Sequence, residues 1–215
     1  MKLLRENFNE LVVKKPDNFI IIFFYAGMGG SSLLRILISH DELYHSFKKL
    51  SQFEYDDPLR YPDSIEGFCI HTDHNLSFKE QHLACVHMDF HTPWEDDNEN
   101  YIEYFKLVKD NKKVVLKTHN FSLYNKFKKC TCIFIGTDEP LNRGLRVSKN
   151  QNPPFLPDEV IYVNINNLMS KNYEKFLEEY LSIVYKLNLT PRINSVRSFI
   201  LMWLERQERF KRSLS

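Results

Sequence analysis

The segment GMGGSS contains the residue types that proteins use to hold an oxyanion. Glycine has no Cβ atom, so Gly27, Gly29 and Gly30 allow backbone N–H groups to turn toward a ligand and approach it closely. The hydroxyl groups of Ser31 and Ser32 can donate further hydrogen bonds or cap a following helix. The segment therefore predicts a site for a phosphate or a sulfate.

A second group of reactive side chains occurs about ninety residues later. Lys117, Thr118 and His119 directly follow the apolar residues Val114–Leu116. An imidazole that titrates near neutral pH can accept a proton from a hydroxyl group, and an ammonium group can offset negative charge on a transferring group. His119 and Lys117 are therefore candidate catalytic residues, with His119 as a base.

The apolar pattern predicts how these two groups are positioned. Residues 19–25 are apolar throughout, as in a strand buried on both faces, and a helical apolar stripe begins near Ser31. Residues 114–116 and 133–135 have the pattern of two more buried strands. Helical patterns alternate with these strands, which predicts an α/β fold: one three-layer domain over residues 1–215, with a central parallel sheet and a P-loop-like strand, glycine loop and helix. Because ligands bind at the carboxyl ends of such strands, both reactive groups are expected to face one crevice.

Two common nucleotide-binding loops do not match this segment. The nucleoside-triphosphate loop has a lysine directly before its hydroxyl residue, and Gly30 occupies that position here. The dinucleotide pattern G-x-G-x-x-G is also absent, because Ser32 stands where its third glycine would be. The sequence therefore disfavours an ordinary ATPase, kinase or dinucleotide-dependent enzyme.

Together, the glycine loop and the Lys-Thr-His segment resemble the sulfotransferase family that uses 3′-phosphoadenosine-5′-phosphosulfate. The resemblance implies that the loop binds the 5′-phosphosulfate of this co-substrate and that His119 is the catalytic base. Residues 132–148 are similar to the next strand and the 3′-phosphate-binding region of the family, which implies that Ser148 binds the 3′-phosphate with Arg143 or Arg146. Residues 160–189 resemble the late strand and long helix that follow. The loop residues implicated are Gly27, Met28, Gly29, Gly30, Ser31 and Ser32.

The chain also departs from the pattern of this family. Met28 stands where the family loop usually has lysine or arginine, and Pro140 falls where its 3′-phosphate arginine is expected. The late Arg-Lys-Gly element has no counterpart. Two alternatives to a sulfotransferase therefore stay open: a nucleotide-binding module of the same fold without transfer chemistry, and a divergent phosphate-transfer enzyme.

Residues 41–91 contain two further features. The stretch 41–76 is rich in Asp, Pro and aromatic residues, and we expect it to be irregular and to form an acceptor lid. Histidines are frequent over residues 71–91, and His87, Asp89 and His91 have the composition of a metal-ligand set. In a helix, however, the Asp89 carboxylate would point away from the two imidazoles. We therefore expect no metal ion, and a histidine of this segment in the acceptor pocket is an open alternative.

Composition limits the class of protein. The formal net charge of +1 from 215 residues argues against a protein that binds nucleic acid by neutralising phosphates. No apolar segment reaches the roughly 20 residues needed to span a membrane, so a cytoplasmic location is expected. The four cysteines form no C-x-x-C pair, which predicts reduced thiols. The partner is expected to be a small molecule or glycan with a hydroxyl group; sugar, lipid, phenol and peptide acceptors all stay open, as does the oligomeric state.

Overall fold

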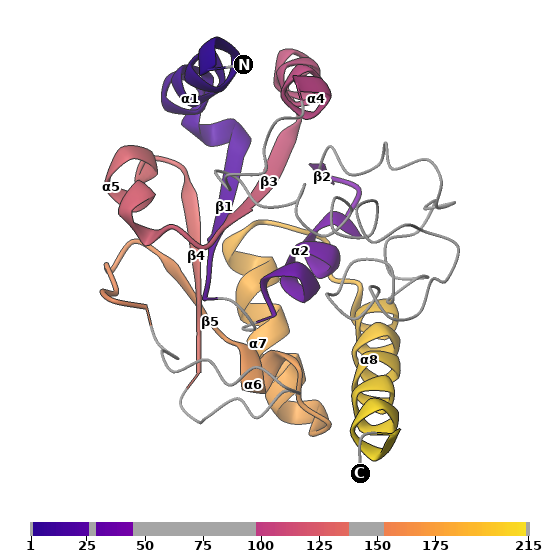
Figure 1. The fold of residues 1–215 in the computed structure, drawn as a ribbon. Helices are drawn as coiled ribbons and strands as arrows, with labels where there is room; N and C mark the ends of the chain where they lie inside the picture. The colour runs from indigo at the N-terminus through magenta and orange to yellow at the C-terminus, as the bar shows by residue number, and fades with distance from the viewer. Residues whose placement is uncertain (1, 26–28, 45–97, 138–152, 214–215) are drawn as a thin grey trace.

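The computed structural model describes residues 2–25, 29–44, 98–137 and 153–213 of the chain. Their centre is a five-stranded sheet in which all neighbouring strands are parallel, in the order β2-β3-β1-β4-β5 (Figure 1). The strands are β1 (Phe19–Phe23), β2 (Leu43–Tyr44), β3 (Lys113–Thr118), β4 (Thr131–Gly136) and β5 (Ile161–Asn164). The predicted parallel α/β fold is confirmed.

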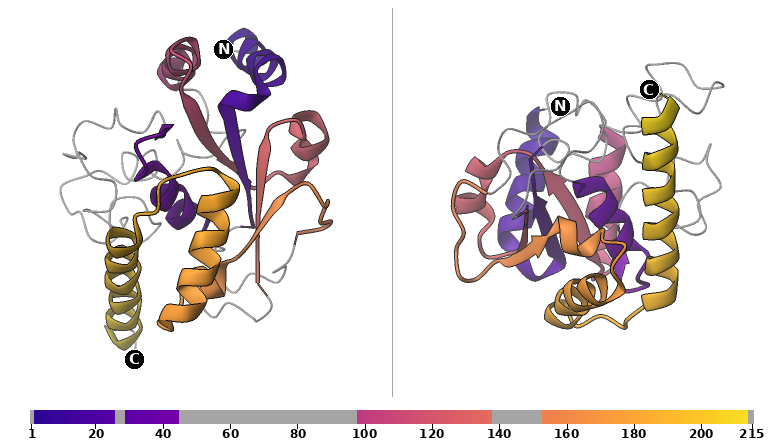
Figure 2. Two further views of the ribbon diagram at one scale, coloured as in Figure 1. Left: turned by 180° about the vertical axis from the view of Figure 1, so that it is seen from behind. Right: turned by 90° about the horizontal axis from the view of Figure 1, so that it is seen from below.

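Helices cover both faces of the sheet, which gives three layers (Figures 1 and 2). Figure 2 shows the long C-terminal helix α8 at one side of the molecule, beyond α2 and α7. One face packs on α1 (Lys2–Lys14), α4 (Asn98–Lys109) and α5 (Tyr124–Phe127), and the other on α2 (Gly30–Ile38), α6 (Ile165–Leu168), α7 (Tyr173–Lys186) and α8 (Ile193–Ser213). The 3-10 turn η1 (Pro16–Asn18) connects α1 to β1, and η5 (Phe121–Leu123) connects β3 to α5.

Strand β1 lies between β3 and β4, and all its side chains are buried. Successive side chains of a strand point to opposite faces. Ile20 and Ile22 therefore pack with α2, α7 and α8, whereas Phe19, Ile21 and Phe23 pack with α1, α4 and α5. This two-sided burial is the physical reason for the uninterrupted apolar run in the sequence.

Helix α7 shows how local sequence fixes an element. Asn172 precedes it in an extended conformation, and its side chain accepts a hydrogen bond from the backbone N–H of Lys175 at 3.1 Å. This is an N-cap, which satisfies a backbone donor that the first turn leaves without a partner. Phe176, Tyr180, Ile183 and Val184 then form a buried stripe, at the three- and four-residue spacing of one helical face.

Strand β2 is an element that the sequence did not predict. Its two residues pair with Lys113 and Val114 of β3 at the edge of the sheet. They fall in the stretch 41–76 that we expected to be irregular, so that expectation is wrong at residues 43–44. Residues 45–97, with the rest of the expected lid and all of the His-rich segment, lie outside the described residues.

Two further sequence expectations can be compared with the structure. Cys130 and Cys132 are free thiols, and burial raises the pKa of each to about 12, so both are protonated at neutral pH. None of the helices among the described residues is long and apolar enough to cross a membrane.

The central strand provides a test of the core. Ile21→Ala removes a fully buried side chain and should lower the free energy of unfolding by about 2–5 kcal/mol, since a cavity is left behind. Urea unfolding followed by circular dichroism measures this change. Leu201→Ala, at a side chain that is 43% exposed, is the control and should change stability by less than about 1 kcal/mol. Equal effects of both substitutions would contradict this placement of β1.

Candidate functional site

The site is built where β1 ends and α2 begins. The backbone N–H of Phe24 donates to the carbonyl of Thr118 at 3.2 Å, which continues the pairing of β1 with β3 by one residue. Gly29 has a φ of 75°, in the left-handed region that glycine adopts without strain. Helix α2 begins at the next residue, and its first helical hydrogen bond runs from Leu33 N–H to the Gly29 carbonyl at 3.0 Å. The amino end of α2 therefore lies close to the carboxyl end of β1, where Gly30 packs on Phe24.

Gly30 is needed for packing. A Cβ atom at this position would lie 2.4 Å from two ring carbons of Phe24, closer than any real contact. The aromatic ring therefore occupies the space over the helix start that a larger residue would fill. This packing gives Gly30 a role in addition to the ligand approach expected from the sequence.

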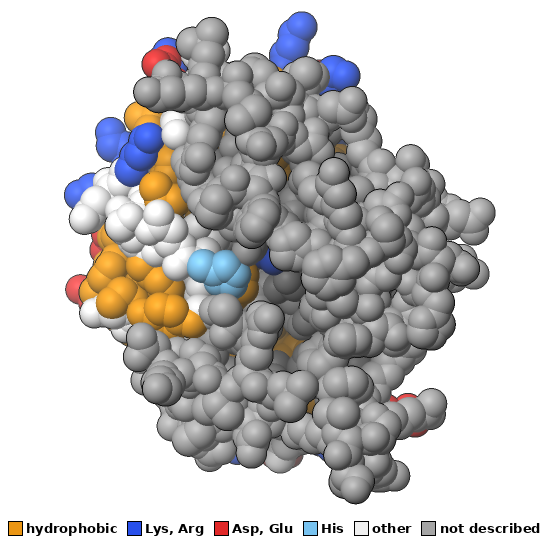
Figure 3. Space-filling model, viewed as in Figure 1, with side chains coloured by type: hydrophobic (Ala, Val, Ile, Leu, Met, Phe, Trp, Pro, Cys, Tyr) orange, Lys and Arg blue, Asp and Glu red, His pale blue; other side chains and the backbone are white. Residues whose placement is uncertain are grey.

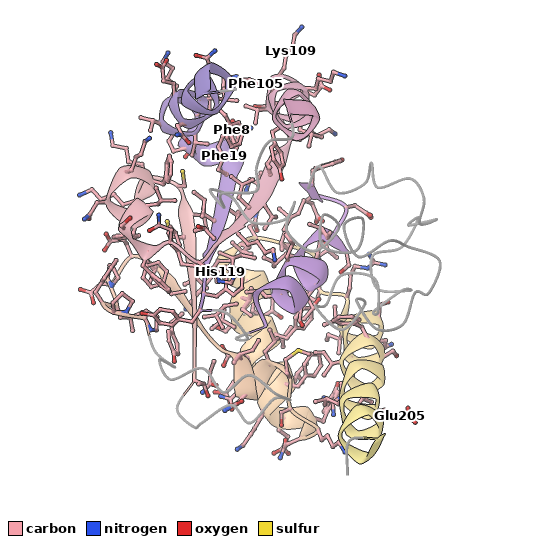
Figure 4. The ribbon with its side chains drawn as sticks, viewed as in Figure 1. Phe8, Phe19, Phe105, Lys109, His119 and Glu205 are labelled. Carbon is pink, nitrogen blue, oxygen red and sulfur yellow. The ribbon has the colours of Figure 1, made fainter. Side chains whose placement is uncertain are left out.

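The same ring contacts the side chains at the end of β3. The centroids of the Phe24 and His119 rings are 4.1 Å apart, and Lys117 Nζ lies 5.4 Å from the Phe24 centroid. Phe24 thus brings the start of α2, Lys117 and His119 together. Figure 4 shows His119 at the end of the sheet next to the region where α2 begins.

His119 is held by its own backbone contact. Its Nδ1 lies 3.0 Å from the carbonyl oxygen of Phe24. A carbonyl oxygen only accepts hydrogen bonds, so Nδ1 carries the proton and donates it. In the neutral ring the lone pair then resides on Nε2, which is the atom that can take a proton from a ligand.

The turn after β3 is fixed by side chains on both sides of His119. The Oγ1 of Thr118 accepts from the backbone N–H of Asn120 at 3.1 Å, and Asn120 Oδ1 accepts from the backbone N–H of Ser122 at 3.1 Å. These bonds stop the strand and begin the 3-10 turn η5. Thr118 is buried and His119 is exposed, so the imidazole lies at the surface while the backbone before it is held in the core.

Lys117 is a buried cation in the middle of this arrangement. It is 3% exposed and pairs in register with Ile22 of β1. An ammonium group loses hydration on burial, and contact with the face of an aromatic ring returns about 0.5–2 kcal/mol of that loss. The result is a fixed positive charge beneath the surface on which His119 lies.

The predicted site residues fall into two groups. The structure brings together Gly29, Gly30, Lys117 and His119, with the backbones of Ser31 and Ser32 in the first turn of α2 and the Ser32 side chain buried. Gly27, Met28, Arg143, Arg146 and Ser148 lie outside the described residues.

Phe24 is the residue that sequence reasoning missed. The sequence presents it as one member of an apolar strand, and its position three residues before Gly27 is the signal that could have identified it.

Comparisons of the chain with protein-family models, with curated proteins and with solved structures found no match.

The contact between Gly30 and Phe24 can be tested by a double-mutant cycle. Gly30→Ala should lower the free energy of unfolding by about 1–3 kcal/mol, because the new methyl group overlaps the ring. Phe24→Leu removes part of the ring, so the double variant should lose less stability than the two single losses added together. Strictly additive losses in urea unfolding would show that the two residues are not in contact.

Proposed function

We propose that this chain is a sulfotransferase that moves a sulfuryl group from 3′-phosphoadenosine-5′-phosphosulfate to a hydroxyl acceptor, with His119 as the general base. The observation that carries the proposal is the contact of one ring, Phe24, with the start of α2, with Lys117 and with His119. A helix amino end, a lysine and an imidazole are therefore close to one ring, which supports the arrangement that the resemblance to the sulfotransferase family implies. The cytoplasmic location expected from the sequence stays part of this proposal.

The proposed reaction is an in-line displacement at sulfur. His119 Nε2 accepts the proton of the acceptor hydroxyl while its oxygen attacks the sulfur atom. The bond between sulfur and the bridging oxygen breaks, and the electron pair leaves with the 5′-phosphate of the nucleotide product. Lys117 stabilises charge on the sulfuryl and bridging oxygens, and the first N–H groups of α2 hold the phosphosulfate.

A second candidate is a nucleotide-binding module without transfer chemistry. Met28 favours it, because this residue provides no cation to the loop that would contact the phosphosulfate. Isothermal titration with 3′-phosphoadenosine-5′-phosphate and transfer of radiolabelled sulfate to a panel of hydroxyl acceptors distinguish the two. The module predicts binding of the nucleotide without transfer to any acceptor.

The role of His119 is tested with a pair of variants. His119→Ala and His119→Gln should each lower the rate of sulfate transfer by about 10²–10⁴-fold, since neither side chain accepts a proton at neutral pH. Glutamine keeps a polar N–H donor that the Phe24 carbonyl can accept from, which alanine lacks. Binding of the nucleotide product should not change in either variant. Transfer at the wild-type rate by His119→Gln would remove His119 from the mechanism.

The charge of Lys117 can be tested with a variant that keeps the length of the side chain. Lys117→Met keeps the length of the side chain and removes its charge, so kcat and affinity for the nucleotide product should each fall at least about tenfold. The melting temperature is measured alongside, so that a loss of charge can be told from a loss of fold. Lys128→Met, at an exposed lysine, is the matched control and should leave all three quantities unchanged. Unaltered kinetics in Lys117→Met would contradict an electrostatic role.

A further inference from the structure

The segments that lead into the three central strands are rich in lysine. They are residues 14–18 before β1, 109–113 at the start of β3 and 126–130 before β4, and are here called the lysine edge. Apart from the half-buried Lys112, all of their lysine side chains are exposed. The lysines are Lys14, Lys15, Lys109, Lys112, Lys113, Lys126, Lys128 and Lys129.

The topology of the sheet brings these segments together. Strands β3, β1 and β4 are neighbours and run parallel, so all three begin at the same edge of the sheet. The Asn18 side chain donates to the Lys112 carbonyl at 3.1 Å, which joins the segments before β1 and β3. Neighbouring strands lie about 4.8 Å apart, so the backbones of the three segments lie within about 10 Å of one another.

The lysine edge lies at the opposite end of the strands from the candidate site. Figure 4 labels Phe19, the first residue of β1, near the top of the view with Lys109, and labels His119 lower down, beyond the end of β3. Figure 3 shows Lys and Arg side chains gathered along the upper and upper-left border of the same view, where Figure 1 places α1, α4 and α5. A partner at the lysine edge would therefore leave the candidate site uncovered.

The lysine edge carries an excess of positive charge. Asp17 and Asp110 are its acidic residues. Glu10 pairs with Lys14 at 3.0 Å, and the charge of Lys128 helps to lower the pKa of Glu159. Eight lysines thus face four nearby carboxylates. Because the formal net charge of the whole chain is only +1, the remainder of the chain is net negative, and the positive charge is concentrated at one end of the molecule.

Helix stabilisation accounts for only part of this pattern. Lys14 and Lys109 are the last residues of α1 and α4, where a cation is favourable at the negative end of the helix dipole. Lys113 lies in β3, and Lys129 lies between α5 and β4, so neither belongs to a helix end. The convergence of lysines from outside the helices indicates attraction to an external anion.

The residue types favour a lipid surface over nucleic acid. The lysine edge contains no arginine, the side chain that recognises single phosphates by paired hydrogen bonds, whereas lysine acts as a point charge on a flexible stem. Single-stranded nucleic acid is bound by exposed aromatic rings between the cations, and the exposed aromatic side chains among the described residues all lie elsewhere. The exposed hydrophobic residue next to the lysine edge is Val13, at 47%. An anionic bilayer attracts such lysines without requiring a fixed geometry.

We propose that the lysine edge docks the protein on the surface of an anionic phospholipid bilayer, with the edge that carries Lys117 and His119 turned away from the lipid. The attraction is electrostatic and peripheral, between the lysine ammonium groups and the lipid phosphates and carboxylates. This orientation leaves the candidate site open to ligands from solution. The docking does not depend on the proposed transfer chemistry, because the two use opposite ends of the strands.

Co-sedimentation of the full chain with vesicles tests the proposal. Vesicles of phosphatidylcholine with about 30% phosphatidylserine should bind the protein at least tenfold more tightly than vesicles of phosphatidylcholine alone. Raising NaCl from about 50 mM to about 300 mM should weaken this binding several-fold, because salt screens exposed charges. Both comparisons use the unaltered protein and so do not depend on the folding of any variant.

A pair of double variants locates the contact. Lys113→Gln with Lys129→Gln should weaken binding to the phosphatidylserine vesicles about tenfold or more, and the exposure of both side chains should preserve the fold, as circular dichroism can check. Lys171→Gln with Lys175→Gln is the matched control, because it removes two exposed lysines at the start of α7, which follows the carboxyl end of β5. The control should bind as the unaltered chain does.

Three results would overturn the proposal. They are equal binding to both kinds of vesicle, an equal loss of binding in the two double variants, and tighter binding to a single-stranded oligonucleotide than to the phosphatidylserine vesicles in the same buffer. The last result would assign the lysine edge to nucleic acid instead.

Discussion

The packing of the Phe24 ring against Gly30 is the contact on which the arrangement of the site depends. It fixes how closely the start of α2 approaches the end of β1. The same ring also contacts Lys117 and His119. The carbonyl of the same residue orients the imidazole. One residue thus sets both the distance between the two halves of the site and the direction of its base.

The electrostatics of the site follow from two features of the backbone and one side chain. The first turn of α2 has its N–H groups and the positive end of the helix dipole at the carboxyl edge of the sheet. Lys117 adds a full positive charge that is almost completely buried. A buried cation beside a helix amino end makes this edge favourable for an anion, and the charge is little screened by solvent.

Sequence alone predicted the elements of this fold better than the contacts of the site. The apolar runs of β1 and β3 and the stripe of α7 are encoded locally, the first two as continuous apolar segments and the third by a period of 3.6 residues. The two-residue strand β2 is too short to carry such a pattern. The bond between His119 and Phe24 joins residues that are 95 positions apart, so no local pattern could have revealed the proton-bearing nitrogen. The burial of Lys117 likewise arises only when β1 and β3 pair.

The order of the strands has a consequence for how the chain acquires its structure. Strand β1 forms near the amino end, yet its partners are β3 at residues 113–118 and β4 at residues 131–136. High contact order of this kind slows folding, since a long loop must close before the pairing contributes. During synthesis, the apolar strand β1 therefore stays without its neighbours until residues 113–136 have left the ribosome. A nascent or truncated chain that ends before β4 would be a natural client for chaperones that recognise extended apolar segments.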